Sequence, residues 1–332
     1  MVETKIFAKD QIDEAVELLR EGELVAFPTE TVYGLGAIAT KEKSVKNVYK
    51  AKGRPSDNPL IVTVSDEKMV KRYAKSVPDR AKKLIKHFWP GPLTILLFVK
   101  EGSLPTAVTG GLKTVAFRCP DDKLTHDLIA KLGYPIVGPS ANTSTKPSPT
   151  TAQHVYHDLK GKIAGIIDGG ETRVGLESTI VDLSVETPIV LRPGEITPEE
   201  ISEVLGEEVL INTGKVSDKE IPKAPGMKYR HYAPSAPVVV VDDVNDFAKI
   251  DFNDHIGVMA LEDELDKIDL PKANKFNLGK NLVDADHNLF GGLRYFDDKK
   301  DITQIYVQGF NEGQASLAYM NRLNKAAGGH HF

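Results

Sequence analysis

The segment PTETVYGLG, Pro28–Gly36, indicates the class of fold because it follows directly on the apolar run Leu24–Phe27. Such a run predicts a short buried strand, and the proline ends it. A polar loop at the carboxyl end of a buried strand is where α/β proteins place their ligands. Within this loop, Gly34 and Gly36 lack the third glycine of a GxGxxG motif, so we expect a tight turn there rather than a dinucleotide site.

Apolar runs and helical patterns alternate on both sides of this loop. Before it, Asp10 is expected to cap a helix that Gly22 ends. After it, strands are predicted at 60–64, 93–99, 114–118, 135–137, 163–167, 179–183 and 188–191, and helices at 78–88, 121–132 and 150–159. Strands interleaved with helices predict an α/β or α+β domain of roughly 200 residues.

The composition changes between residues 206 and 236. This region contains most of PKAPGMKYRHYAPSAP (222–237), whose four prolines exclude a regular helix or a central strand. Beyond it, apolar strand patterns at 238–241, 256–261 and 305–307 alternate with helical patterns near 282–296 and 314–327. We therefore predict a domain at 1–205, a linker or lid at 206–236 and a small α/β domain at 237–332.

Composition argues against several classes of protein. The 332 residues have a formal net charge of −5, which disfavours bulk coating of nucleic acid but leaves room for a local basic groove. The charged N-terminus lacks the apolar core of a signal peptide, and no run approaches the roughly 20 apolar residues of a spanning helix. The single cysteine, Cys119, cannot pair internally and fits a reducing compartment, so we expect a cytoplasmic protein with this thiol buried as a small hydrophobe.

Familiar catalytic motifs are missing from the sequence. It contains no GxxxxGKS/T phosphate loop, no GxSxG nucleophile elbow, no HExxH and, with one cysteine, no zinc box. If the chain uses ATP, side chains rather than a glycine-rich cradle must hold the phosphates.

Two further segments are suited to anions. In KAKGRPSDNPL (50–60), basic residues precede two prolines, and a cation cluster on a stiff loop can neutralise a polyphosphate. In GPSANTSTKPSPTTA (138–152), hydroxyl and amide side chains lie between a predicted strand and a helix, where they can bind phosphate or ribose. Taken alone, the first is more often a solvated charge run and the second a loop with a helix cap.

Arginines and tyrosines extend this pattern. Arg118 and Arg192 each end a predicted strand and lie shortly before a proline (FRCP and LRPG), which suits fixed guanidinium groups, although such arginines are usually structural. Tyr33 and Tyr49 fit core aromatics with bonded hydroxyls better than base-stacking platforms. The co-occurrence of five polar, anion-suited loops in one α/β domain favours a ligand site.

In chain order, PTETVYGLG, KGRPSDNPL, SANTSTKPSPT, GLESTIVD and LRPG resemble the YrdC-like fold of threonylcarbamoyl-AMP synthases, and PGMKYRHYAP with a small C-terminal domain resembles the longer, two-domain form. The resemblance implies a twisted mixed sheet with flanking helices around an open basic cavity, joined by a Pro-rich linker to a small Rossmann-like domain. It implies a nucleotidyltransferase that joins L-threonine, bicarbonate or CO2, and ATP, and releases pyrophosphate. The L-threonylcarbamoyl-AMP would pass to a tRNA threonylcarbamoyl-transferase complex that modifies adenosine 37.

The resemblance also implies residue roles. The basic pair Lys52 and Arg54 would be catalytic, together with Mg²⁺ held mainly by the ATP phosphates rather than by protein ligands. The ATP contacts would be Lys52, Arg54, Asn58, Thr114, Ser140, Asn142, Ser148, Arg192 and Tyr232. The threonine contacts would be Thr31, Thr63, Arg118, Gly138 and Ser178. Relatives often have histidine where this chain has Thr63, which can hydrogen-bond but cannot act as a base.

Two other functions stay open at this point. One is an RNA-binding module of the same fold, which salt-sensitive RNA binding without nucleotide turnover would reveal. The other is a carbamoyl-transfer enzyme of the hydrogenase-maturation type, although such chains carry added regions that are missing here. Direct tRNA binding and the role of the C-terminal domain are left open, and no membrane partner is expected.

Overall fold

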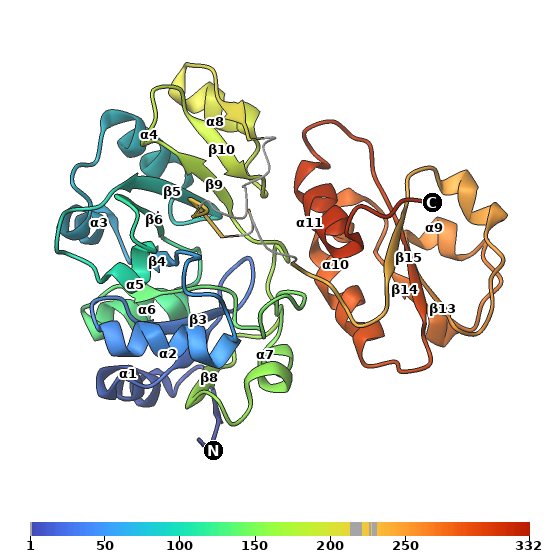
Figure 1. Ribbon diagram of the computed structural model, residues 1–332, viewed down its shortest axis with the longest axis horizontal. Helices are drawn as coiled ribbons and strands as arrows, with labels where there is room; N and C mark the ends of the chain where they lie inside the picture. The colour runs from blue at the N-terminus through green and yellow to red at the C-terminus, as the bar shows by residue number, and fades with distance from the viewer. Residues whose placement is uncertain (1, 213–220, 226, 228–230) are drawn as a thin grey trace. The chain divides into compact units, whose positions relative to one another are not determined.

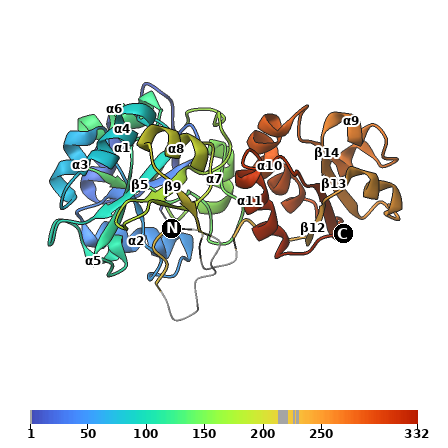
Figure 2. The ribbon, with the colours of Figure 1, turned by 90° about the horizontal axis from the view of Figure 1, so that it is seen from above.

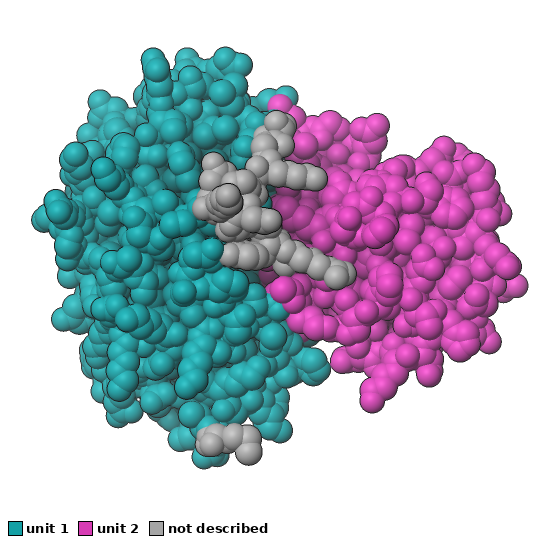
Figure 3. Space-filling view, in the orientation of Figure 1, with its two compact units in different colours: residues 1–144, 149–173, 177–228 teal, residues 145–148, 174–176, 229–332 magenta. Residues whose placement is uncertain are grey.

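The computed structural model describes residues 2–212, 221–225, 227 and 231–332, and it divides into two compact units (Figures 1 and 3). Unit 1 comprises residues 1–144, 149–173 and 177–228. Unit 2 comprises residues 229–332 together with two short segments, 145–148 and 174–176. These two segments therefore belong to unit 2 because they make most of their contacts with the C-terminal part of the chain.

Unit 1 contains, among the described residues, one mixed sheet of eleven strands in the order β1-β8-β2-β3-β7-β4-β6-β5-β9-β10-β11. The strands are β1 Lys5–Phe7, β2 Val25–Phe27, β3 Gly34–Ile38, β4 Ile61–Thr63, β5 Leu93–Phe98, β6 Thr114–Arg118, β7 Ile136–Val137, β8 Gly165–Ile167, β9 Thr179–Asp182, β10 Ile189–Arg192 and β11 Leu210–Ile211. The helices are α1 Ile12–Glu21, α2 Glu42–Lys52, α3 Glu67–Tyr73, α4 Asp79–Phe88, α5 Thr106–Thr109, α6 Lys123–Leu132, α7 Ala152–Leu159 and α8 Pro198–Leu205. In Figure 1, α1 packs beside α6, and α4 beside α8.

The two faces of this sheet differ because side chains alternate along a strand. On β6, Val115 and Phe117 enter the main core of the unit, whereas Ala116 faces the other way into a smaller apolar cluster. Thr114 and Arg118 share the face of Ala116 because they stand two residues from it. We call this the site face; it also carries Thr63 of β4 and Thr94 of β5, which pair with Arg118 on either side.

Two local predictions near the N-terminus are wrong. Gly34 and Gly36 lie in strand β3 rather than in a tight turn, because the ring of Phe27 on β2 packs directly over Gly34 and would clash with any Cβ there. Helix α1 has Gln11 at its N-cap position, so Asp10 is not the cap. Gly22 ends the helix as expected, with a left-handed φ of 95° that favours glycine.

Unit 2 contains a parallel sheet in the order β12-β15-β13-β14. Helices α10 and α11 cover one face, and η1 and α9 lie on the other (Figures 1 and 2). The continuous apolar run of β12 agrees with a strand buried on both faces. The elements are β12 Val238–Val241, η1 Val244–Lys249, β13 Ile256–Ala260, α9 Glu262–Leu265, η2 Lys272–Asn274, β14 Lys275–Asn277, α10 Leu282–Asp297, β15 Gln304–Gln308 and α11 Leu317–Ala327.

The mixed α/β class, with a large mixed sheet and a separate small parallel sheet, confirms the predicted fold class. None of the helices formed by the described residues is long and apolar enough to cross a membrane.

Candidate functional site

Three of the predicted threonine contacts come together on the site face. Thr63 and Arg118 are direct partners in the parallel register of β4 and β6. Gly138 follows β7, and its amide donates to the carbonyl of Ile61 on β4 at 2.9 Å. A Cβ on Gly138 would lie 2.5 Å from Oγ1 of Thr63, so only glycine allows this approach. The sheet pairing therefore places these residues of distant sequence position side by side.

Ser178, the fourth of these contacts, is tied to Arg192, a predicted ATP contact. The guanidinium of Arg192 donates to the carbonyl of Ser178 at 3.0 and 3.1 Å and lies 3.2 Å from its hydroxyl. That hydroxyl is in turn 2.7 Å from Oγ1 of Thr94, the residue opposite Arg118 on β5. Thr94 has no signal in the sequence beyond its place on a predicted strand, and the sequence analysis missed it.

Thr31 is fully buried in the loop between β2 and β3. Its hydroxyl lies 3.0 Å from that of Thr29, which accepts hydrogen bonds from the amides of Thr31 and Val32. This turn fixes Glu30 between the two threonines. Oε2 of Glu30 lies 2.8 Å from Nη2 of Arg118, and both side chains are almost wholly buried. Glu30 lies within the PTETVYGLG segment, but no feature of the sequence distinguishes it from its neighbours.

The basic residues of the segment 50–60 do not all lie on a loop, contrary to the sequence prediction. Lys50 and Lys52 lie in the last turn of α2, not on a stiff loop, and Gly53 ends the helix with a φ of 62°. Helical geometry leaves Lys50 exposed and turns Lys52 inward, where only 2% of it is exposed. Arg54 folds back on its own segment, and its Nη2 donates to the carbonyl of Pro59 at 3.0 Å.

Lys52 joins two of the predicted ATP-binding motifs. Its Nζ donates to the carbonyl of Asn142 at 2.7 Å and also bonds the carbonyl of Ser140. The amide of Ser144 closes the connection by donating to the carbonyl of Lys52 at 2.8 Å. A buried ammonium thus holds the serine- and asparagine-containing loop against the end of α2. Asn58, at the end of the basic segment, has a buried Oδ1 that finds no hydrogen-bond partner within the described parts of the chain.

Ser148 and Tyr232 both belong to unit 2. Arg294 on α10 donates to the carbonyls of Pro147 at 2.6 Å and Ser148 at 3.3 Å. Tyr232 is buried against Phe290, with ring centroids 5.1 Å apart. Its φ of 63° is left-handed, which is rare outside glycine and is often found at functional sites.

Described residues near the middle of the Pro-rich linker lie on the site face. Ala224 and Met227 join the apolar cluster of that face, whose sheet residues are Ile61, Leu96, Ala116, Ile180 and Leu191. Lys223 forms an ion pair at 2.9 Å with Asp182, a fully buried carboxylate at the end of β9. Residues 213–220, 226 and 228–230 of the predicted linker or lid lie outside the described residues.

The remaining sequence predictions concern single side chains. Tyr33 and Tyr49 are core aromatics with bonded hydroxyls, as expected; that of Tyr49 donates to the carbonyls of Asn58 and Ala107 at 3.0 and 2.8 Å. Burial raises the pKa of Tyr49 to about 12. Cys119 is buried at the end of β6, and burial raises the pKa of its thiol to about 12. The thiol is therefore a core group, as predicted.

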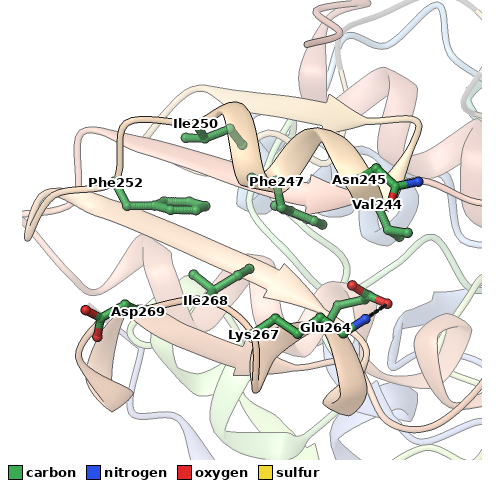
Figure 4. A pocket seen from close by; sticks show the side chains of 10 residues that line it. Val244, Asn245, Phe247, Ile250, Phe252, Glu264, Lys267, Ile268 and Asp269 are labelled. Carbon is green, nitrogen blue, oxygen red and sulfur yellow. Dashed lines mark hydrogen bonds and ion pairs between the residues drawn. The ribbon is translucent and has the colours of Figure 1, made fainter.

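Two cavities among the described residues of unit 2 hold none of the predicted site residues. Figure 4 shows the first, of about 290 Å³, which has an apolar wall that includes Phe247 and Phe252. The second, of about 380 Å³, lies at the carboxyl ends of β13 and β15, and its charged side chains are Glu262, Asp263, Glu264 and Lys280. Three carboxylates against one ammonium repel a polyphosphate. Within the described residues, no group of three or more His, Cys, Asp or Glu side chains is placed to hold a metal ion.

Two family models match the chain in succession: "Telomere recombination" at residues 17–194 and "Threonylcarbamoyl-AMP synthase, C-terminal domain" at 196–328. The threonylcarbamoyl-AMP synthase of Bacillus subtilis is 45% identical over 96% of this chain and 93% of its own length. That of Pyrococcus abyssi is 45% identical over 95% of this chain and 93% of its own length. The crystal structure of P. abyssi Sua5 complexed with L-threonine has a TM-score of 0.88 and 42% identity, and the match covers 100% of this chain and 99% of that one.

Proposed function

The chain belongs to the threonylcarbamoyl-AMP synthase family, and we propose which of its residues carry the synthesis of L-threonylcarbamoyl-AMP. In this reaction the amine of L-threonine adds to CO2 and gives a carbamate. A carbamate oxygen then attacks the α-phosphorus of ATP, and the bond from that phosphorus to the oxygen of the leaving pyrophosphate breaks. No covalent enzyme intermediate is needed, which agrees with a sequence that lacks a nucleophile motif.

L-Threonine binds on the site face, with its carboxylate on Arg118. The observation that carries this assignment is the register of β4, β6 and β5, which lines up Thr63, Arg118 and Thr94 on one face. Hydroxyl groups beside a guanidinium suit a small hydroxy amino acid. The P. abyssi relative, which this chain matches along its whole length, was crystallised with L-threonine, and this supports the assignment.

ATP binds across the end of α2 and the loop that Lys52 holds. Negative charge builds on the departing pyrophosphate, and Lys52 and Arg54 offset it. A Mg²⁺ ion held by the ATP phosphates would supply further positive charge there. The buried Oδ1 of Asn58 has no hydrogen-bond partner among the described residues, and it would orient the nucleotide together with the amides and hydroxyls of the 140–142 loop. Thr114, Ser148, Arg192 and Tyr232 complete the proposed set.

The linker acts as a lid over the site face. A carbamate and a mixed anhydride are both labile in water, so the reaction needs a cover. Ala224 and Met227 pack on the apolar part of the face, and the Lys223–Asp182 ion pair anchors them there. The product then passes to a transferase that modifies tRNA, and we place both steps in the cytoplasm because the lone thiol fits a reducing compartment.

The test is release of pyrophosphate from ATP and Mg²⁺, with L-threonine and bicarbonate supplied together or singly. Release that needs both, with the adenylate identified by mass spectrometry, would establish the assignment. Release indifferent to threonine would move the substrate to another amine. Absence of release from folded protein, with salt-sensitive RNA binding in its place, would favour an RNA-binding module instead.

A further inference from the structure

We propose that Glu30 is a catalytic residue that receives the α-ammonium group of L-threonine beside Arg118 and accepts its proton. The proposal rests on the proposed function of the site face and adds a residue to it. The side chain of Glu30 is 1% exposed and that of Arg118 is 9% exposed, and Oε2 and Nη2 lie 2.8 Å apart. A charged pair this deeply buried calls for a physical reason.

The pair is poorly satisfied by the protein itself. Both carboxylate oxygens of Glu30, and Nε and Nη2 of Arg118, form no hydrogen bond with any of the residues that the structure describes. Their close contact therefore lacks hydrogen-bond geometry. Burying two charges is favourable only when hydrogen bonds satisfy their remaining lone pairs and protons, and buried charged groups left without such bonds destabilise the fold. The two groups are placed to bond to something besides each other.

An amino acid zwitterion has the matching charges. Its carboxylate and ammonium groups stand on one carbon atom, as the guanidinium and carboxylate stand side by side here. Threonine entering between them exchanges one ion pair for two, Arg118 with its carboxylate and Glu30 with its ammonium. Every charge keeps an opposite neighbour, and the four unpaired protein atoms gain partners.

The surroundings of Glu30 favour a cation. Burial first, and the charge of Glu30 in addition, raise the pKa values of Asp122 and Glu195. Both carboxyl groups are thus close enough to interact with Glu30. Glu195 also interacts with Arg118 and, more strongly, with Arg173. The three carboxyl groups still outnumber these two guanidinium groups, so the surroundings attract an ammonium group more strongly than a neutral one.

The bound ammonium must lose protons before the reaction can begin. One N–H proton passes to the carboxylate of Glu30, and the freed lone pair attacks the carbon of CO2. The N–C bond forms while one C=O electron pair moves onto oxygen, and the second nitrogen proton leaves to water. Glu30 therefore supplies the base that neither Thr63 nor the hydroxyls of the site face can provide.

The first experiment compares two ligands by calorimetry on the full chain. One is L-threonine; the other is 2,3-dihydroxybutanoate of the same configuration, in which a hydroxyl replaces the ammonium group. The wild-type chain should prefer threonine by about tenfold or more, and Glu30→Gln should abolish that preference because both ligands then meet a neutral amide. ATP affinity should stay unchanged, and Glu23→Gln, an exposed glutamate, should behave like wild type.

The second readout is the rate of pyrophosphate release as a function of pH. The ratio of the Glu30→Gln rate to the wild-type rate should rise with pH, by up to about tenfold per unit, because solvent then deprotonates the amine. Using the ratio removes the pH dependence of CO2 supply. Arg118, Cys119, Asp122 and Glu195, the titratable groups that interact with Glu30, are present in both proteins.

The outcomes separate the possibilities. If Glu30→Gln lowers the affinity for both ligands equally and the rate ratio does not change with pH, Glu30 only positions Arg118 and the proposal fails. The proposal also fails if the variant keeps the wild-type preference. If Glu30→Gln does not fold, Glu30→Asp replaces it in the same assays. The shorter side chain keeps the negative charge but places it farther from the ligand, so the preference for threonine over 2,3-dihydroxybutanoate should fall. A wild-type chain that binds no threonine at all would instead contradict the proposed function.

Discussion

The core face and the site face of the unit 1 sheet are built from the same strands, yet they carry different chemistry. Val115 and Phe117 of β6 enter the apolar core, while Thr114 and Arg118 stand on the opposite face. Apolar burial on the core face stabilises the fold. Burying charges on the site face costs free energy of solvation, so these charges do not serve stability. Substitutions on the core face should therefore change stability first, and substitutions around the site face should change activity first.

The strongest expected effect is at Lys52. Lys52→Ala should lower the kcat of pyrophosphate release by about 100-fold or more, because it removes positive charge near the phosphates and releases the loop of Ser140 and Asn142 that this ammonium holds. The matched control is Lys50→Ala: this lysine lies on the same helical turn but is exposed, so its loss should change kcat less than about twofold. Steady-state kinetics check both. Equal effects of the two variants would show that helical position does not separate a catalytic lysine from a solvated one.

A smaller effect is expected at the lid anchor. Among the described residues, Lys223→Ala leaves the charge of the fully buried Asp182 with the amide and hydroxyl of Ser184 as its remaining hydrogen-bond donors. The lid should open more often, so we expect about a tenfold rise in the ratio of hydrolysed to intact adenylate. Chromatography of the products measures this ratio. Lys113→Ala, an exposed lysine of unit 1, is the control, and an unchanged ratio in Lys223→Ala would exclude the anchoring role.

Much of the fold could be predicted because buried strands are continuous apolar runs and amphipathic helices repeat apolar residues at a regular spacing. The predicted bounds of β6 and β12 coincide with the observed strands. Helix α2 was missed because its sequence, EKSVKNVYKAK, is dominated by lysines that hide the spacing of Val45, Val48 and Tyr49. Strand β3 was misjudged because its glycines, a residue type that usually marks turns, are here required by the ring of Phe27 at Gly34 and by the carbonyl of Val25 at Gly36.

The site was predictable in its loops but not in its pairings. Each motif could be recognised along the chain, because loops after buried strands carry ligands. The contacts Glu30–Arg118 and Thr94–Ser178 join residues about 90 positions apart. They depend on the strand order β2-β3-β7-β4-β6-β5-β9, which no local pattern specifies.

A pH effect on stability is expected in unit 2. Burial acts to raise the pKa of Asp297, but hydrogen bonds from Ser235 and Lys146 outweigh it and lower the pKa. A lowered folded-state pKa means that the stabilisation is complete above the ordinary aspartate pKa of about 3.9 and is lost as the pH falls through the folded-state value. Asp297→Asn should lower the thermal midpoint by a few degrees near pH 6, and by less near pH 3.

The matched control for this change is Asp301→Asn, at an exposed carboxylate near the end of α10. It should leave the midpoint unchanged at both pH values. Thermal unfolding followed by circular dichroism measures each variant. If Asp297→Asn lowers the thermal midpoint equally at pH 3 and pH 6, packing rather than the charge of Asp297 holds Lys146 and Ser235.

The smallest expected effect concerns Cys119, the neighbour of Arg118 along the chain. These consecutive residues lie on different sides of the comparison, since Arg118 belongs to the site face and Cys119 to the main core. Burial first, and the charges of Asp66 and Glu30 in addition, raise the pKa of the thiol to about 12, so almost no thiolate exists at pH 8. Iodoacetamide should leave the folded chain unmodified while labelling it rapidly in urea, as mass spectrometry would show. Labelling of the folded chain at the rate of a free thiol would mean that Cys119 is accessible to solvent. The core face would then not be closed next to Arg118, and the two faces would not differ as described at this point.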